Sequence, residues 1–180
     1  MVTPVSASRR QNTQRHSRAV WSVASGVVDP ELPMLTLADL GVLRDVEVTA
    51  DGTVVVSITP TYSGCPAMGA MRDDLRASLH RAGYAAVEVR TVLHPAWSTD
   101  WISDAGRRKL ADNGIAPPGP APRPTTGPVP LTLQAPGRTA DCPNCGSADT
   151  EEISEFGATA CRALRRCHAC REPFEHVKEI

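Results

Sequence analysis

The spacing of apolar residues changes several times along the chain, and each change predicts a new element. Between residues 19 and 28 they recur at intervals of three and four, which predicts a helix. The prolines of Asp29-Pro-Glu-Leu-Pro33 prevent this helix from continuing. Residues 42–49 and 53–58 are runs rich in β-branched residues with alternating faces, and Asp51-Gly52 suits a tight turn between them. We therefore expect a helix followed by a β-hairpin.

A second helix and a third strand follow the hairpin. Over residues 66–82 the apolar side chains form a stripe at helical spacing, and Gly83 is placed to end the helix. Residues 86–93 return to strand-like alternation, and residues 103–113 predict a short helix capped by Ser103. The order helix, strand, strand, helix, strand, helix predicts an α/β (α+β) domain over residues 19–114. In this domain helices cover a small three-stranded sheet.

Composition separates three further segments from this domain. Residues 1–18 hold four arginines and no acidic residue, and without visible periodicity they are interpreted as a disordered basic tail. Their composition also matches that of an organelle transit peptide. Residues 115–140 contain eight prolines, which predicts a semi-rigid linker. Residues 141–180 form a second module.

The overall charge gives no indication of an anionic partner. The net charge is −1, and no apolar run approaches the roughly 18 residues of a membrane span. The module at 141–180 holds five basic and eight acidic residues, the opposite of a phosphate-binding balance. We therefore expect a cytoplasmic protein that binds neither nucleic acid nor membrane.

Two pairs of cysteines predict a zinc ribbon in the C-terminal module. Cys142 and Cys145 form one C-x-x-C pair, Cys167 and Cys170 form another, and 21 residues separate the two pairs. Each pair places two thiolates on one tight turn, which suits half of a tetrahedral Zn²⁺ site. About forty residues bury too little surface to fold without such a staple. Two disulfides in a secreted module are the alternative. Cys161 is a spare buried thiol, an alternative ligand or a redox partner.

Cys65 is the one cysteine outside that module. It lies in the loop before the second helix, and Pro66 suits the first position of that helix. At such a place the helix dipole and unpaired N–H groups stabilise a thiolate, which is a nucleophile and a metal ligand. Packing under the sheet is an equal alternative. His94 ends the third strand and approaches Cys65 if the second and third strands end on one side.

Several motifs together make the chain similar to a known family. Asp29-Pro-Glu-Leu-Pro33, Asp39-Leu-Gly-Val42 and Thr59-Pro-Thr-Tyr-Ser-Gly-Cys-Pro66 resemble the small domain of iron–sulfur cluster assembly factors of the SufT kind. Pro95-Ala-Trp-Ser-Thr-Asp-Trp101 and Cys170-Arg-Glu-Pro-Phe174 resemble the PaaD family, also called PaaJ. That family provides the small subunit of the phenylacetyl-CoA epoxidase system. The resemblance extends from about residue 20 to the C-terminus.

The resemblance implies an accessory role in aerobic phenylacetate breakdown rather than catalysis. The partners it implies are the epoxidase subunits: a di-iron oxygenase and a reductase carrying flavin and an iron–sulfur cluster. By the same resemblance Cys65 handles iron or a transient cluster, and Asp29 and Glu31 help to shape that site. The chain departs from the family at Val177-Lys-Glu179, where family members often end in Phe-Lys-Cys.

Four hypotheses follow for the function. In the first, the protein is a maturation subunit that assists delivery of iron or an iron–sulfur cluster through Cys65. In the second, it is a zinc-stabilised structural adaptor of the oxygenase complex with no role in metal transfer. A thiol enzyme with Cys65 as nucleophile is disfavoured because no paired base is evident. A nucleic-acid-binding ribbon is disfavoured by charge.

Overall fold

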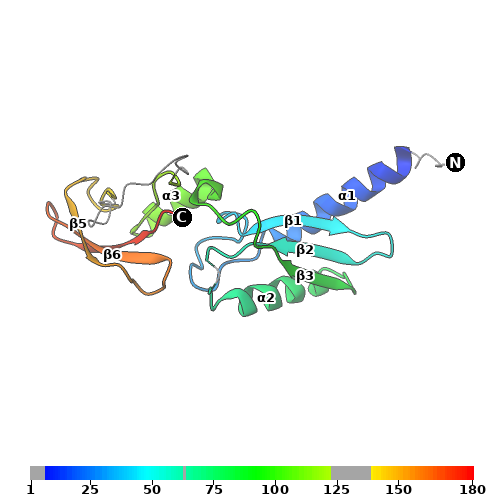
Figure 1. Ribbon diagram of the computed structural model, residues 1–180. Helices are drawn as coiled ribbons and strands as arrows, with labels where there is room; N and C mark the ends of the chain where they lie inside the picture. Colours follow the sequence, from blue (N-terminus) through cyan, green and yellow to red (C-terminus); the bar gives the residue numbers. More distant parts are fainter. Residues whose placement is uncertain (1–6, 63, 123–138) are drawn as a thin grey trace, which may run out of the picture. The chain divides into compact units, whose positions relative to one another are not determined.

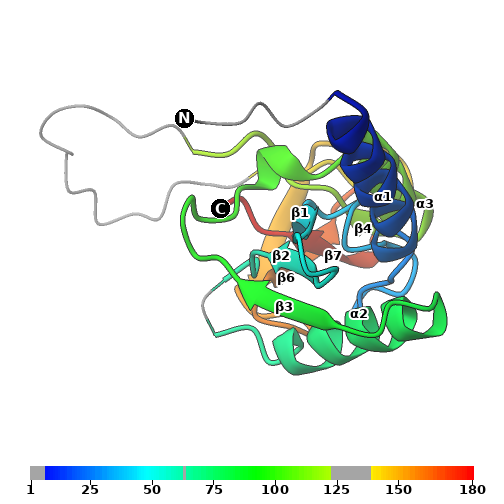
Figure 2. The ribbon, with the colours of Figure 1, turned by 90° about the vertical axis from the view of Figure 1, so that its right-hand side faces the viewer.

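The structure of the protein, a computed structural model, describes residues 7–62, 64–122 and 139–180. The chain divides into two compact units, Met1–Trp97 and Ser98–Ile180, and each is described by itself (Figures 1 and 2). The prediction of a mixed α/β fold with a three-stranded sheet, helices and a C-terminal ribbon is confirmed. In the described part of the chain, no helix has both the length and the apolar character needed to cross a membrane.

The first unit is a three-stranded sheet with two long helices. In chain order its elements are α1 (Ala7–Ala24), β1 (Leu43–Val48), β2 (Val54–Ile58), α2 (Met68–Arg81) and β3 (Val87–Thr91). The strand order is β1-β2-β3, with β1 antiparallel and β3 parallel to β2 (Figure 1). The predicted hairpin is present, and Gly52 adopts the positive φ of +88° that its turn requires. A β-α-β crossover therefore carries the chain from β2 through α2 to β3.

The core of the first unit lies between the sheet and the helices. α1 contacts β1 and α2, and α2 contacts β3. Along β2 the side chains of Val54, Val56 and Ile58 are completely buried, and Leu75 and Leu79 of α2 are equally buried. A buried side chain of this size contributes about 1.5–3 kcal/mol to stability. The stripe that predicted the helix is therefore the surface that holds it on the sheet.

The N-terminal helix is longer than predicted. α1 begins at Ala7, whereas residues 1–18 were expected to form a disordered tail. Residues 7–18 contain neither proline nor glycine, so nothing in them opposes a helix. Apolar periodicity begins only at Val20, and Val20 and Ala24 are completely buried, so this end of the helix packs on the core. The pattern therefore identified the end of the helix that carries these buried residues, and residues 1–6 lie outside the described residues.

The second unit is built around a four-stranded sheet. Its elements are η1 (Thr99–Trp101), α3 (Asp104–Asp112), β4 (Ile115–Ala116), β5 (Thr150–Ser154), β6 (Arg162–Cys167) and β7 (Pro173–Val177). The strand order is β4-β7-β6-β5, and only the β4–β7 pair is parallel. Ser103 caps α3 as expected, since its Oγ accepts the Gly106 N–H at 2.9 Å. β5 and β4 form the two edges of the sheet.

The boundary between the units differs from the prediction. Residues 98–114 were assigned to the α/β domain and 115–140 to a linker, yet residues 98–122 belong to the second unit. The Thr99 N–H donates to the Ile180 carbonyl at 3.1 Å, and the Gly119 N–H donates to Glu179 Oε1 at 3.0 Å. These hydrogen bonds join residues far apart in the sequence, so the local spacing of apolar residues could not predict them. The predicted linker residues 123–138 lie outside the described residues.

Candidate metal centre and the Cys65 loop

Two similar turns bring four thiols together in the second unit. Cys142 and Cys145 precede β5, Cys167 ends β6, and Cys170 precedes β7. The four Sγ atoms all lie within 4.8 Å of one another. Cys142 Sγ is 3.7 Å from Cys170 Sγ, and Cys145 Sγ is 3.6 Å from Cys167 Sγ. Thiols 28 and 22 residues apart in sequence are thus adjacent in space.

The two turns repeat the same backbone geometry. The Cys142 N–H donates to the Ser147 carbonyl at 2.9 Å, and the Cys167 N–H donates to the Glu172 carbonyl at 3.0 Å. The residue that follows the second cysteine of each pair is left-handed, with φ of 73° at Gly146 and 67° at Arg171. Arg171 follows the second pair as Gly146 follows the first, and this correspondence was the signal in the sequence that could have identified it. The turns are therefore equivalent halves of one site.

The spacing of the sulfurs fits a tetrahedral metal ion. A zinc–sulfur bond is about 2.3 Å, and in a tetrahedron this places neighbouring sulfurs about 3.8 Å apart. The two shortest separations here, 3.6 and 3.7 Å, are close to that value. Four thiols without carboxylate or water ligands form a closed shell, typical of structural rather than catalytic sites. The arrangement is that of a four-cysteine metal-binding site.

The thiols of this site differ in pKa because their hydrogen bonds and surroundings differ. The Cys170 N–H points at Cys167 Sγ at 3.5 Å, and this bond, with others, lowers the pKa of Cys167 to about 6. At Cys170 a backbone hydrogen bond from Glu172 acts to lower the pKa, but burial and the neighbouring thiols outweigh it and raise the pKa above its ordinary value. Metal binding therefore has to displace a proton from Cys170, whose thiol is harder to ionise than that of Cys167.

The site is buried on one side and open on the other. Cys142 and Cys167 pack with Ala116, Ala140 and Phe174 in a small apolar cluster. Cys145 is exposed, and Cys170 is half-buried. Ala116 belongs to β4, so the segment once expected to be a linker helps to cover the metal-binding site. This cluster is the second unit's hydrophobic support for the four thiols.

Cys161 lies outside the four-thiol cluster. It directly precedes β6, whereas Cys167 ends that strand, so about 20 Å of extended chain separates the two. Its Sγ lies 3.1 Å from Thr159 Oγ1, and its carbonyl accepts the Lys178 N–H at 3.0 Å. Of the three interpretations left open for Cys161, the alternative ligand is therefore not supported by its position.

Cys65 occupies the crossover loop between β2 and α2. α2 begins at Met68 rather than Pro66, so Cys65 lies two residues before the N-cap residue Ala67. The Cys65 N–H donates to the Tyr62 carbonyl at 3.2 Å, and its own carbonyl accepts the Met68 N–H at 3.4 Å. The side chain is half-buried and is not in a disulfide. The thiol therefore sits beside the first turn of the helix and not deep in the core.

The parallel pairing of β2 and β3 determines at which edge of the sheet the Cys65 loop lies. Ile58 pairs with Thr91, so both strands end at the same edge of the sheet. The loop of Cys65 and the segment of exposed Leu93 and His94 therefore leave from one side. This was the condition under which His94 was expected to approach Cys65, and it is met. In α/β folds this edge, at the carboxyl ends of parallel strands, is the usual location of functional loops.

Asp29 has a structural task that the sequence did not reveal. Its side chain is only 4% exposed. Oδ1 accepts the N–H groups of Glu31 and Leu32, each at 2.8 Å, and the Asp29 N–H donates to the Leu35 carbonyl at 2.9 Å. The acidic turn is thereby closed on itself. Glu31 is half-buried, and neither residue belongs to the cluster of metal-ligating groups found among the described residues.

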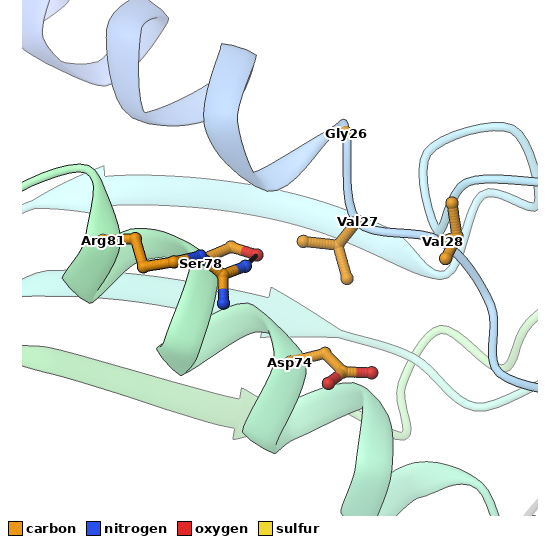
Figure 3. Close-up of a pocket in the computed structure, with 6 residues that line it drawn as sticks. All are labelled: Gly26, Val27, Val28, Asp74, Ser78 and Arg81. Carbon is orange, nitrogen blue, oxygen red and sulfur yellow. Dashed lines mark hydrogen bonds between the residues drawn. The ribbon is translucent and has the colours of Figure 1, made fainter.

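A pocket in the first unit lies between the end of α1 and the flank of α2 (Figure 3). Arg81 and Ser78 line it from α2, and the two are joined by a 3.0 Å hydrogen bond from Arg81 Nη2 to Ser78 Oγ. Gly26, Val27 and Val28 form its other wall. No thiol or imidazole lines it, so its chemistry does not suit the handling of soft metals.

Comparison with known proteins assigns both parts of the chain. Residues 17–91 match the model of the iron–sulfur cluster assembly protein family, and residues 126–178 match the PaaD zinc beta ribbon domain. A protein of Escherichia coli K12, whose name describes it as a subunit of a "Putative 1,2-phenylacetyl-CoA epoxidase", is 42% identical over 161 residues. The match covers 89% of this chain and 92% of that protein. The chain belongs to the PaaD family.

Other relatives of this PaaD-family chain share the first unit. A protein of Porphyromonas gingivalis named Fe-S protein maturation auxiliary factor is 34% identical over 85 residues, covering 47% of this chain and 80% of that protein. A crystal structure of a domain of unknown function, DUF59, from Bacillus anthracis is 25% identical with a TM-score of 0.52. It covers 56% of this chain and 96% of that one. This chain thus combines this domain with a ribbon.

Proposed function

We propose that the protein is an accessory maturation subunit of the phenylacetyl-CoA 1,2-epoxidase system, assisting delivery of iron or an iron–sulfur cluster through Cys65. The observation that carries the proposal is the joining of two domains in one chain. Residues 17–91 match an iron–sulfur assembly family, and residues 126–178 match a ribbon named for the PaaD family. A domain of the first kind suits a helper of the oxygenase. Its place is the cytoplasm, where thiol ligands stay reduced.

Zinc is the proposed occupant of the four-thiol site, and its role is structural. Soft thiolates select zinc or iron–sulfur centres over harder cations, and zinc favours the closed tetrahedral shell. Ligands that come from two separated turns tie the strands to one another. Binding therefore contributes directly to the folding free energy of the second unit.

Iron or a cluster is the proposed cargo at Cys65. The half-buried thiol is accessible at the edge where functional loops gather, and Gly64 and Pro66 beside it are exposed. One thiolate supplies one of the four thiolates that usually hold an iron–sulfur cluster, so the remaining ligands come from outside this loop. Transfer then proceeds by ligand exchange, in which the recipient's ligand replaces Cys65 without any change of oxidation state.

The test compares Cys65→Ala with Cys161→Ala as a matched control in cells that depend on phenylacetate. We expect the Cys65→Ala protein to accumulate and hold zinc normally while the oxygenase is purified with several-fold less iron and epoxidises poorly. Cys161→Ala should leave both readouts unchanged. Full iron loading and epoxidation with Cys65→Ala would refute the delivery role.

A structural adaptor without metal transfer is the second candidate. One observation favours it: the carboxylate of Asp29, which the family resemblance assigned to the iron site, is engaged in closing its own turn. Under this hypothesis, substitution of the ribbon cysteines abolishes copurification with the oxygenase, and Cys65→Ala changes neither assembly nor iron content. The same pair of measurements therefore separates the two candidates.

A further inference from the structure

We infer that the free edge of β5 is the surface through which the ribbon binds a basic, extended segment of an epoxidase-system protein. The inference rests on the proposed function and identifies the face by which that partner is held. We call this surface the acidic edge, defined by Asp149, Glu151, Ile153, Glu155 and Phe156. It joins three properties: an open strand edge, an excess of acidic side chains and two exposed apolar side chains.

The strand edge comes from the topology of the second sheet. β5 is the last strand in the order β4-β7-β6-β5, and it pairs with β6 on one side (Figure 1). Within residues 7–62, 64–122 and 139–180, no strand pairs with its other side. An open edge presents a row of N–H and C=O groups that a second extended chain can satisfy by adding a strand. A shift of register between Glu152 and Ser154 interrupts this row once.

The charge of the edge selects the partner. Residues 139–161 contain five acidic residues and no lysine or arginine. Glu152 is paired with the buried Arg165 at 3.5 Å, and Glu151 lies 3.8 Å from His168. Asp149 and Glu155 form no ion pair with any residue that the structure describes. Unneutralised carboxylates attract lysine and arginine and repel phosphate, so the edge favours a basic protein segment over nucleic acid or an anionic membrane.

Two apolar side chains supply contact area beside the charges. Ile153 is 52% exposed and Phe156 is 63% exposed, both well above what a buried core position shows. The Lys178 ammonium lies 4.5 Å from the centre of the Phe156 ring, which holds the ring in place while leaving much of it exposed. Aromatic and aliphatic anchors with a polar rim are typical of protein interfaces. An added strand with alternating basic and apolar residues would use both features.

Backbone pairing and hydrogen bonds connect the acidic edge to the turn that carries Cys167 and Cys170. Thr150 pairs with Cys167 across β5 and β6, and the His168 N–H donates to the Asp149 carbonyl at 3.0 Å. On the inner side, Arg165 is 3% exposed and its Nη2 donates to Thr150 Oγ1 at 3.2 Å. The turn that carries Cys167 and Cys170 therefore sets the position of β5. Removal of the metal should weaken partner binding even though no edge residue is a ligand.

The experiment measures binding of the full-length, zinc-loaded chain to purified epoxidase-system subunits in low and high salt. The variant Glu151→Lys/Glu155→Lys reverses two exposed edge charges, and Asp74→Lys/Asp112→Lys makes the same net change at exposed sites elsewhere. Ile153→Asp removes an anchor while keeping the edge acidic. Zinc content and thermal unfolding of each variant confirm that it is folded.

We expect the edge charge reversal to weaken binding at least tenfold in low salt, the control pair to change it less than twofold, and Ile153→Asp to weaken it several-fold. Wild-type binding should also fall as salt rises, because exposed charges are screened. Cross-linking followed by mass spectrometry should identify a lysine- or arginine-rich segment of the partner beside β5. If wild type and edge variants bind equally, this inference fails while the proposed function stands. If wild type binds no epoxidase-system subunit, both fail.

Discussion

Arg171 adopts a left-handed backbone conformation, and the equivalent position in the other turn is occupied by a glycine, Gly146. Both residues follow the second cysteine of a pair, and both have positive φ, 67° at Arg171 and 73° at Gly146. A left-handed conformation costs a residue with a Cβ about 1–2 kcal/mol. The metal-binding turn imposes this conformation because the Cys167 N–H must reach the Glu172 carbonyl.

Substitutions at these two positions should therefore change stability in opposite directions. Arg171→Gly should stabilise the zinc-loaded protein by about 0.5–1 kcal/mol, because the relief of strain exceeds the entropic cost of glycine. Gly146→Ala should destabilise it by about 1 kcal/mol. Thermal unfolding with zinc in excess measures both changes. A loss of stability in Arg171→Gly would show that the arginine side chain contributes more than its backbone costs.

Asp29 should matter to folding more than its acidic neighbour does. Its Oδ1 accepts two N–H groups at a nearly inaccessible position, so Asp29→Ala should lower the free energy of unfolding by about 1–3 kcal/mol. Asp29→Asn keeps an acceptor oxygen and should recover part of that loss. Glu31→Ala, at a half-buried site, should change stability by less than about 0.5 kcal/mol. Urea denaturation measures all three. Unchanged stability in Asp29→Ala, together with a loss of iron handling, would indicate that the Asp29 carboxylate serves the iron site and not the fold.

Among the elements, the metal-binding turns respond to pH because the metal binds thiolates. At pH 8 Cys167, with a pKa of about 6, is already ionised, whereas Cys170, with a raised pKa, must release a proton when metal binds. Lowering the pH therefore favours the metal-free form, and the dependence steepens near pH 6, where Cys167 also takes up a proton. We expect apparent zinc affinity to fall about tenfold or more per pH unit between 8 and 6.

Chelator competition at pH 6, 7 and 8 measures this dependence. Cys65→Ala is the control, and it should follow the wild-type curve because Cys65 lies outside the four-thiol cluster. An affinity that is independent of pH would mean that the four sulfurs are not the ligands.

The elements also show how far the sequence leads. The apolar stripes of α2 and the alternation in β2 predicted elements that exist, because the same residues are buried where those elements meet. The two C-x-x-C pairs predicted the cluster because cysteine spacing within a turn is a local property. Pairing of β4 with β7 and the role of Asp29 depend on contacts with distant or backbone groups. No local pattern records those contacts, so they could not be predicted.

At the scale of the whole molecule, the two units should lose structure separately. The metal site lies entirely in Ser98–Ile180, and the first unit has its own buried core. Removing zinc should therefore unfold much of the second unit and leave the first intact. Hydrogen exchange read by mass spectrometry should show faster exchange over β5, β6 and β7 after chelation, with β2 and α2 unchanged. Equal loss of protection in β2 and α2 would contradict the independence of the two units.

The central claim is that the cysteines have two separate tasks: four hold structural zinc, and Cys65 handles iron or a cluster. Its most direct test is metal analysis of protein purified anaerobically, incubated with ferrous iron and sulfide, and desalted. The account predicts zinc and iron in the wild type, zinc without iron in Cys65→Ala, and loss of zinc in Cys142→Ala. Iron in Cys65→Ala equal to that in the wild type would contradict it.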